Sequence, residues 1–307
     1  MKKSLLTLSL LSSLSLFGCD GASDYNGGRG EMPNGELTLS ITDAAVDNAS
    51  EVWVQFSAIE LKPESGKSIT YTFNTPMRIN LLSLQGSNSL DFFNNLSVPS
   101  GVYNWVRLAV DTDAVADSYI TIPNDSPNAH HELTIPSGSQ SGLKINNGFI
   151  VGANSQVAMT IDFDLRKSVV EANGEYLLKP VLRLVDNDEA GALTGSIDSS
   201  FTVGANCSDQ DPDTGNAVYV FAGHDSSVDD IDSISPDPVT TALMSLNVQT
   251  GNYDYEVGFL PVGNYTVAYT CMADLDDPEV DDAILFQFVT NATVEAPVEL
   301  QGAEFNR

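Results

Sequence analysis

The chain has 307 residues, 42% of them hydrophobic, and carries 13 Lys and Arg against 42 Asp and Glu, a formal net charge of −29 at pH 7. A field of this sign repels polyanions, so the composition excludes nucleic acid as a partner and favours cations and basic surfaces. The alternative explanation of the acidity is solvation alone, which needs no ligand.

Residues 1–18 have the three parts of a secretory signal peptide. A positively charged start precedes an apolar stretch of Leu and Ser, which ends in Gly18 just before the expected cut. The apolar run from Leu5 to Phe17 is too short to span a hydrocarbon core of about 30 Å, so we expect no transmembrane helix there. If Cys19 is incidental, the alternative is an ordinary secreted protein.

Leu16-Phe17-Gly18-Cys19 resembles the lipobox of bacterial lipoproteins, in which the cysteine is acylated and becomes the N-terminus of the mature chain. Phe17 departs from the small residue that lipoboxes carry at its position. The resemblance implies lipidation at Cys19 and anchoring to a membrane of a bacterial cell envelope, inner or outer, with the protein facing the periplasm or the cell surface. More than one acyl chain makes such anchoring stable. Residues 19–34, rich in Gly and polar side chains, predict a flexible tether.

From residue 35 onwards the sequence predicts an all-β fold. Runs rich in Val, Ile, Thr, Tyr and Phe alternate with polar residues and are separated by Gly, Pro, Asn and Asp. In the first part these runs are 37–41, 52–56, 69–73, 77–82, 103–110, 119–122, 132–135, 156–163 and 176–185. In the second part they are 192–197, 217–221, 242–248, 253–259, 265–271, 284–289 and 292–300. Short helix is expected only at 90–96 and directly after Asp164.

A change in charge marks the expected domain boundary. After Arg183 the next basic residue is Arg307, and from Leu184 to Asn306 the chain has 23 acidic residues and no Lys or Arg. We therefore predict two antiparallel β-sandwich domains in tandem, residues 35–187 and an acidic C-terminal domain at 188–307, behind the lipoprotein signal peptide and tether.

Several motifs of the first predicted domain resemble the bacterial domain-of-unknown-function family numbered 4382. They are Gly35-x-Leu37-x-Leu39-x-Ile41-Thr42-Asp43-Ala44, Val52-Trp53-Val54-Gln55-Phe56, Ile79-Asn80-Leu81-Leu82, the Pro99 to Gly101 turn, Asp162 to Val170, and Tyr176 to Arg183. The chain departs from the family pattern at Ala45, where the family usually has Pro. The resemblance implies a cell-envelope lipoprotein, and it implies no biochemical activity.

The second predicted domain resembles the carboxypeptidase-regulatory or transthyretin-like β-sandwiches. The similarity rests on Gly191 to Ile197, on Gly251-x-Tyr253 and on Leu260-Pro261-x-Gly263-x-Tyr265. In the last motif a Pro-containing turn reverses the chain and the Tyr stands on the next strand. The resemblance implies one small sandwich.

Two cysteines remain once Cys19 is assigned to the lipid. Cys207 and Cys271 are an even pair in a compartment where disulfides persist, and neither has a second Cys or a His at metal-ligand spacing. We predict that they form a disulfide.

Two acidic loops predict a calcium site. The first carries carboxylates at alternate positions, Asp209, Asp211 and Asp213, and the second follows Cys271 with Asp274, Asp276 and Asp277. Ca²⁺ prefers six to eight oxygen ligands, and a disulfide between the two cysteines would bring both loops to one end of the sandwich. Calcium is therefore the one cofactor that the sequence suggests, with solvated turns as the alternative.

No catalytic motif stands out, so we expect a non-catalytic binding or scaffolding module whose partner is an envelope protein or a glycan. A calcium-dependent surface adhesin or ligand binder is the first alternative. The second is a carboxylate-based hydrolase, because Asp162 and Asp164 lie two apart on an expected strand and therefore on one face.

Overall fold

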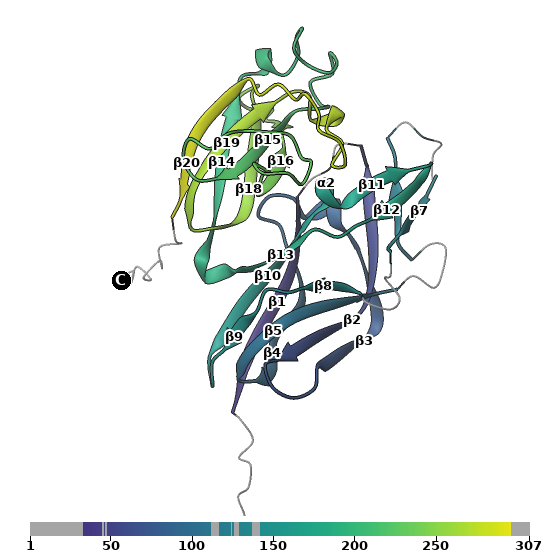
Figure 1. The fold of residues 1–307 in the computed structure, drawn as a ribbon, viewed down its shortest axis with the longest axis vertical. Helices are drawn as coiled ribbons and strands as arrows, with labels where there is room; N and C mark the ends of the chain where they lie inside the picture. Colours follow the sequence, from purple (N-terminus) through teal and green to yellow (C-terminus); the bar gives the residue numbers. More distant parts are fainter. Residues whose placement is uncertain are drawn as a thin grey trace, which may run out of the picture. The chain divides into compact units, whose positions relative to one another are not determined.

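The computed structural model of the chain describes residues 33–44, 46, 48–111, 117–123, 125, 129–136 and 142–295. The predicted signal peptide, Cys19 and the tether up to residue 32 lie outside these residues. Pro33–Arg307 forms one compact unit. The described fold is all-β with a sandwich-like arrangement of sheets, as the sequence predicts (Figure 1).

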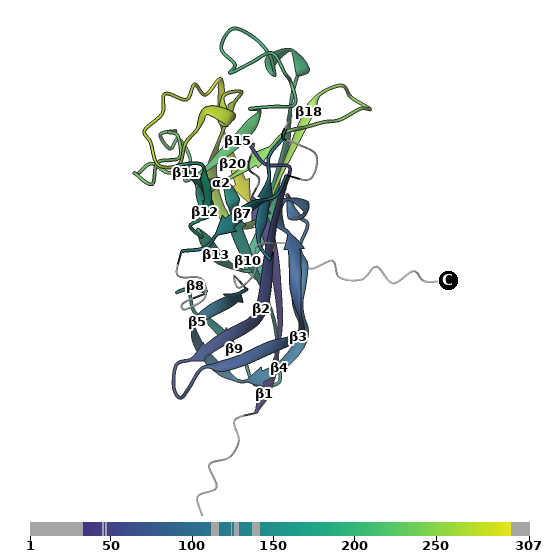
Figure 2. The same cartoon turned by 90° about the vertical axis from the view of Figure 1, so that its right-hand side faces the viewer.

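The first strand set builds two sheets. Its strands are β1 (Asn34–Ala44), β2 (Glu51–Pro63), β3 (Ile69–Asn80), β4 (Leu90–Pro99), β5 (Gly101–Val110), β6 (Tyr119–Thr121), β7 (His131–Thr134), β8 (Leu143–Ile145), β9 (Phe149–Val151), β10 (Gln156–Asp164), β11 (Val169–Ala172), β12 (Glu175–Leu178) and β13 (Leu182–Asp186). One sheet has the order β13-β10-β1-β4. The other has the order β11-β12-β7-β6-β2-β5-β8, with β3 added on β2 and β9 on β5 (Figure 2). A 3₁₀ turn, η1 (Leu81–Leu84), and a one-turn helix, α2 (Leu165–Ser168), complete the set.

The core of this set follows the alternation that the sequence shows. In β2 the side chains of Val52, Val54 and Phe56 are fully buried while their neighbours are partly exposed. They join a continuous cluster that includes Leu37 and Ile161 from the facing sheet. Alternate burial is what a strand with one face on a core requires, and it explains why the period-2 signal was reliable here.

The pairing of β1 with β10 is parallel, whereas the sequence predicts antiparallel sandwiches. Their register places Thr42 opposite Asp162 and Asp43 opposite Phe163. β7 and β12 also pair parallel, and the remaining pairs of the set are antiparallel. Because parallel neighbours end at the same edge of a sheet, two motifs that are 120 residues apart finish side by side at the end of β1 and β10.

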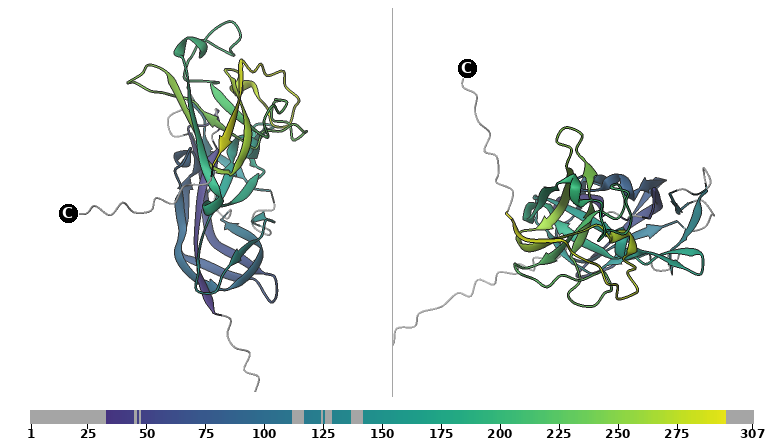
Figure 3. Two further views of the ribbon diagram at one scale, coloured as in Figure 1. Left: turned by 90° about the vertical axis from the view of Figure 1, so that its left-hand side faces the viewer. Right: turned by 90° about the horizontal axis from the view of Figure 1, so that it is seen from above.

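The second strand set has two antiparallel sheets and shares no strand with the first among the described residues. Figure 3 shows its strands in green and yellow. Its strands are β14 (Ala190–Ile197), β15 (Ala217–Ala222), β16 (Thr240–Leu243), β17 (Ser245–Leu246), β18 (Tyr253–Pro261), β19 (Gly263–Thr270) and β20 (Phe288–Val294). The orders are β14-β18-β17 and β16-β15-β19-β20. Short 3₁₀ turns are η2 (Asn187–Glu189), η3 (Ser199–Phe201) and η4 (Ala273–Leu275). The change of sheets lies close to the predicted boundary at residue 187. That the two sets are separate domains stays a prediction.

Both strand sets use the same hairpin device. Pro99 and Tyr103 flank the turn between β4 and β5, and Pro261 and Tyr265 flank the turn between β18 and β19. In each case the Tyr hydroxyl donates to the carbonyl oxygen of the Pro at 2.7 Å. A buried Tyr needs a partner for its hydroxyl, so this bond fixes the turn while the ring fills the core.

The expectations for local structure were partly wrong. The single strand expected at 176–185 is two strands, β12 and β13, and the two strands expected at 69–73 and 77–82 are the one strand β3. The segment expected as helix at 90–96 is strand β4, which pairs with β1 through two register shifts. Bulges break the period-2 pattern and so hide a strand from sequence analysis. The strand expected at 284–289 exists only at its end, because β20 begins at Phe288. The short helix expected after Asp164 is α2.

Candidate functional site

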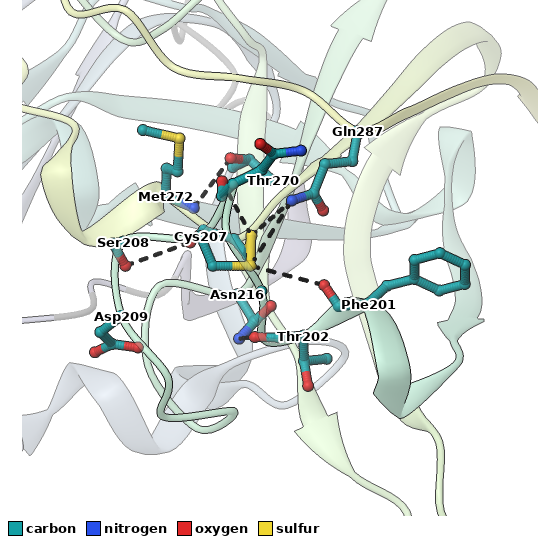
Figure 4. The surroundings of a disulfide bond; sticks show 12 residues. Phe201, Thr202, Cys207, Ser208, Asp209, Asn216, Thr270, Met272 and Gln287 are labelled. Carbon is teal, nitrogen blue, oxygen red and sulfur yellow. Dashed lines mark hydrogen bonds between the residues drawn. A yellow bond between two sulfur atoms is a disulfide. The ribbon is translucent and has the colours of Figure 1, made fainter.

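The predicted disulfide is present and joins Cys207 to Cys271, 64 residues apart (Figure 4). Cys271 directly follows β19, and Cys207 lies in the connection between η3 and β15. The Ser208 amide donates to the Cys271 carbonyl at 3.0 Å, and the Gln287 side-chain amide donates to the Cys271 sulfur. The disulfide therefore fastens the first predicted acidic loop to the start of the second.

The carboxylates of the first acidic loop accept hydrogen bonds from groups of the same loop and from Tyr253. Asp209 accepts from the Asp211 amide at 2.8 Å and from the Thr214 hydroxyl at 2.7 Å. Asp211 accepts from the Asp213 amide at 3.0 Å, and Asp213 accepts from the Tyr253 hydroxyl at 2.9 Å. Side chains that bond to the backbone two residues on form Asx turns, and the alternate spacing of the aspartates suits such turns as well as it suits a cation.

The second acidic loop separates its three predicted ligands. Asp274 contacts the first loop: a Cβ added to Gly215, whose φ is +65°, would lie 2.4 Å from Asp274 Oδ1. Asp277 accepts from the Glu279 amide at 3.0 Å. Asp276 accepts from the Tyr219 hydroxyl at 2.5 Å and from the Ile231 amide. The disulfide does bring the two loops together, but the carboxylates of Asp274, Asp276 and Asp277 do not converge with those of the first loop into one cluster of ligand atoms among the described residues.

The carboxylates that do converge are Asp230, Asp276 and Asp282. One carboxylate oxygen from each lies within 4.8 Å of the other two, and this is the one such group found in the described part of the chain. Asp230 lies in the connection between β15 and β16, and Asp276 and Asp282 lie between β19 and β20. Oxygen donors of this kind are those that hard cations prefer. The cluster could therefore hold a metal ion.

Two carboxylates of this cluster, those of Asp230 and Asp276, accept from backbone amides of the opposite connection, and Asp282 accepts from the Asp277 amide of its own connection at 2.8 Å. Asp230 Oδ2 accepts from the Asp282 amide at 2.5 Å, and Asp276 accepts from Ile231 N at 3.2 and 3.3 Å. Burial raises the pKa of Asp230, although the Asp282 amide opposes this shift. Burial also raises the pKa of Asp276 to about 6, against the Tyr219 hydrogen bond and the charge of Arg166, which lower it.

Basic residues from the first strand set contact the second. The Arg166 side chain, only 3% exposed, donates to the Thr241 hydroxyl at 3.2 Å and to the Ala273 carbonyl at 2.8 Å. Its guanidinium lies 5.7 Å from the centre of the Tyr219 ring. Lys167 pairs with Asp237, and Lys179 pairs with Glu279. The second strand set contains no Lys or Arg, and these three basic residues of the first set place positive charge against it.

The carboxylates considered for a hydrolase, Asp162 and Asp164, are both buried. Asp162 pairs with Arg183 of the adjacent strand at 2.5 Å. Asp164 caps α2 by accepting from the Lys167 amide at 3.2 Å, and burial raises its pKa to about 6. The cavity beside Asp162 has a volume of about 30 Å³, which is the space of one water molecule.

Part of the chain matches a known family. Residues 34–180 match the family model described as a domain of unknown function, DUF4382, in agreement with the resemblance carried by the motifs of the first part. No curated protein sequence matches the chain. Among the described residues, none of the helices has the length and apolar character needed to cross a membrane.

Two solved structures are distantly similar. The Bacillus anthracis TIE protein is 13% identical, with 86% of this chain and 32% of that chain covered and a TM-score of 0.19. An adhesin candidate from Bacteroides ovatus ATCC 8483 is 10% identical, with 93% of this chain and 88% of that chain covered and a TM-score of 0.19. The chain spans about a third of the TIE protein, and both likenesses are too distant to support an argument.

Proposed function

We propose that the chain is a lipoprotein of a bacterial cell envelope, anchored through acylated Cys19, and that it acts as a non-catalytic binding or scaffolding module. The lipobox resemblance and the match of residues 34–180 to a family expected in envelope lipoproteins support the location. The partner would be an envelope protein or a glycan, reached from the inner or the outer membrane. For the second strand set we propose kinship with transthyretin-like sandwiches, which its two antiparallel sheets, β14-β18-β17 and β16-β15-β19-β20, support.

One observation carries the non-catalytic part of the proposal. Asp162 is used in an ion pair beside a cavity of about 30 Å³, and Asp164 is used as a helix cap. Small-molecule sites have volumes of roughly 300–1,000 Å³, so a sugar ring would not fit in the cavity beside Asp162. A glycosidase also needs room for an attacking water and a leaving group on opposite faces of the sugar.

Anchoring is tested by fractionating cells that produce the native chain or Cys19→Ala. The native chain should remain with the membranes after a high-salt wash, because acyl chains are insensitive to salt, and the variant should be soluble or uncleaved. A variant that is cleaved normally and still partitions fully with washed membranes would refute lipid anchoring.

Binding is tested by pull-down from native envelopes with the lipidated protein, followed by titration of the captured component. Saturable binding supports the module. An enzymatic role is tested on the same preparation with envelope glycans as substrates. Turnover that Asp162→Asn abolishes would show that the non-catalytic assignment is wrong.

A second candidate, calcium-dependent binding, is favoured by the convergence of Asp230, Asp276 and Asp282. In this case binding to envelopes should require calcium and disappear with a chelator. Magnesium should not substitute, because it demands tighter octahedral geometry and sheds its water reluctantly. Binding that is equal in calcium, in magnesium and in chelator would reject this candidate.

A further inference from the structure

We infer that Asp230, Asp276 and Asp282 are the protein ligands of one divalent cation, with calcium preferred, and that this ion clips the β15–β16 connection to the β19–β20 connection. The inference rests on the calcium candidate and goes beyond it in two respects. It names a ligand set that omits the Asp209–Asp213 loop, and it gives the ion a structural role that does not depend on any envelope partner.

The first argument is that Asp230 is buried and one of its carboxylate oxygens lacks a hydrogen-bond partner. Its side chain is 1% exposed, its Oδ2 accepts from the Asp282 amide, and its Oδ1 has no hydrogen-bond partner. A buried carboxylate oxygen without a partner is costly, because it has lost water and gained nothing. This oxygen belongs to a residue whose carboxylate meets those of Asp276 and Asp282, so a bound cation would supply the missing partner.

The second argument is the charge around the cluster. Three carboxylates within 4.8 Å repel one another, and the second strand set contains no Lys or Arg to offset them. Among the described residues, Arg166 of the first strand set approaches the cluster: its guanidinium lies 5.7 Å from the centre of the Tyr219 ring, and the Tyr219 hydroxyl donates to Asp276. One guanidinium leaves a net negative cluster, which a divalent cation would neutralise.

The third argument is size. Ca²⁺–oxygen distances are about 2.3–2.6 Å, so ligands on opposite sides of the ion lie about 5 Å apart, whereas Mg²⁺ at about 2.0–2.1 Å draws them closer. Oxygens that all lie within 4.8 Å of one another can contact one such ion, and Ca²⁺ accepts irregular geometry, whereas Mg²⁺ demands a near-ideal octahedron. Asp276 and Asp282 are partly exposed, which leaves room for the waters that complete six to eight ligands.

The backbone bonds of the cluster explain the structural role. Asp282 N donates to Asp230 and Ile231 N donates to Asp276, so each connection already holds a carboxylate of the other. An ion bound by all three carboxylates would strengthen both of these links between the connections. For a module outside the cytoplasm the expected dissociation constant is about 0.1–1 mM, which is the range of extracellular calcium modules.

Two tyrosines make the location measurable with Tb³⁺, a luminescent substitute for Ca²⁺ that a nearby excited tyrosine sensitises. Tyr219 bonds to Asp276 in the proposed site, and Tyr253 bonds to Asp213 in the other acidic loop. With the full mature chain, Tyr219→Phe should abolish most of the sensitised emission that calcium displaces. Tyr253→Phe should leave this emission unchanged, since the Tyr253 hydroxyl bonds to the other acidic loop. The reverse result would place the ion at Asp209–Asp213 and overturn the inference.

Calorimetric titration with calcium separates this inference from the calcium candidate as a whole. Asp230→Asn and Asp282→Asn should each weaken calcium binding by more than about tenfold. The matched controls Asp281→Asn and Asp211→Asn, which remove the same charge from exposed positions, should leave affinity within about twofold. No calcium binding to the native chain would reject both the site and the candidate. Binding that Asp211→Asn abolishes and Asp230→Asn spares would reject the ligand set alone.

Folding of the variants is checked by thermal unfolding in a chelator. Without the ion, Asp230→Asn and Asp282→Asn should melt no lower than the native chain, because an amide removes charge repulsion from the cluster. Calcium should then raise the melting temperature of the native chain and of the controls only. A calcium increment in Asp230→Asn equal to that of the native chain would overturn the inference.

Discussion

Arg166 Nη1 donates to the carbonyl oxygen of Ala273 at 2.8 Å, across 107 residues of sequence. Arg166 belongs to the family-like motif that follows β10, and Ala273 lies two residues after the disulfide cysteine Cys271. A guanidinium is charged at every accessible pH, and this one is buried, so its bonds to Ala273 and Thr241 compensate for lost water. The motif thus joins the two strand sets.

We predict that Arg166→Met lowers the free energy of unfolding by about 1–3 kcal/mol, because it leaves the buried Thr241 hydroxyl and Ala273 carbonyl without this donor. Lys179→Met is the matched control, since Lys179 and Glu279 form an exposed pair expected to contribute less than about 1 kcal/mol. Urea titration measures both. Equal, small losses would mean that the Arg166 contacts do not hold the strand sets together.

A second prediction concerns a close backbone approach between the sets. A Cβ added to Gly258 of β18 would lie 2.3 Å from the carbonyl oxygen of Gly86, a backbone atom that cannot turn aside as the end of a flexible side chain could. Gly258→Ala should therefore destabilise the protein by about 1–3 kcal/mol. Gly263→Ala, where the nearest atom would be 3.8 Å away, should be close to neutral. Thermal unfolding compares the melting temperatures of the two variants. Similar melting temperatures would contradict the prediction.

The disulfide gives a third prediction. In the chain-entropy account, closing a loop of 64 residues stabilises the folded state by about 4 kcal/mol, as an upper figure. Cys207→Ala with Cys271→Ala should lose up to this amount in urea titration, and a reductant should then have no further effect. Reduction that leaves the stability of the native protein unchanged would mean that the bond contributes nothing.

The alternation of apolar and polar residues predicted most strands, and the even number of remaining cysteines predicted the disulfide. Neither signal predicted the full cluster of Asp230, Asp276 and Asp282. Val52, Val54 and Phe56 alternate with polar residues because one face of β2 meets the core, so β2 could be predicted from the sequence. Strand β4 could not, because bulges in its pairing with β1 interrupt the alternation. Asp276 was singled out because it follows a cysteine. The approach of Asp230 depends on the course of the β15–β16 connection, which no local pattern encodes.

The spacing of Asp209, Asp211 and Asp213 has two physical explanations, and sequence alone does not separate them. Carboxylates at alternate positions can surround a cation, or each can accept a hydrogen bond from the backbone amide two residues on. The structure has the second arrangement at Asp209 and Asp211. The same ambiguity did not affect Cys207 and Cys271, because an even cysteine pair has only one internal pairing.

The last prediction concerns pH and Asp164. Burial raises the pKa of this carboxyl from 3.8 to about 6 in the folded chain. Between these two pH values the folded state binds a proton that the unfolded state does not, so the contribution of Asp164 to stability increases as pH falls through 6 and levels off near 3.8. Above pH 6 the buried charge is retained at a cost of up to about 3 kcal/mol.

Asp164→Asn should remove this dependence, because an amide does not titrate but keeps an oxygen to accept from the Lys167 amide. The variant should be more stable than the native chain at pH 7.5, and its advantage should shrink as pH falls towards 4. The control is Asp198→Asn. Hydrogen bonds from Ser200 lower the pKa of Asp198, so the pH dependence of its contribution to stability is opposite to that of Asp164: the contribution is lost as pH falls. Urea titrations across this range, in chelator so that no cation contributes, measure the differences. A constant difference between Asp164→Asn and the native chain at all pH values would show that Asp164 is not the titrating group.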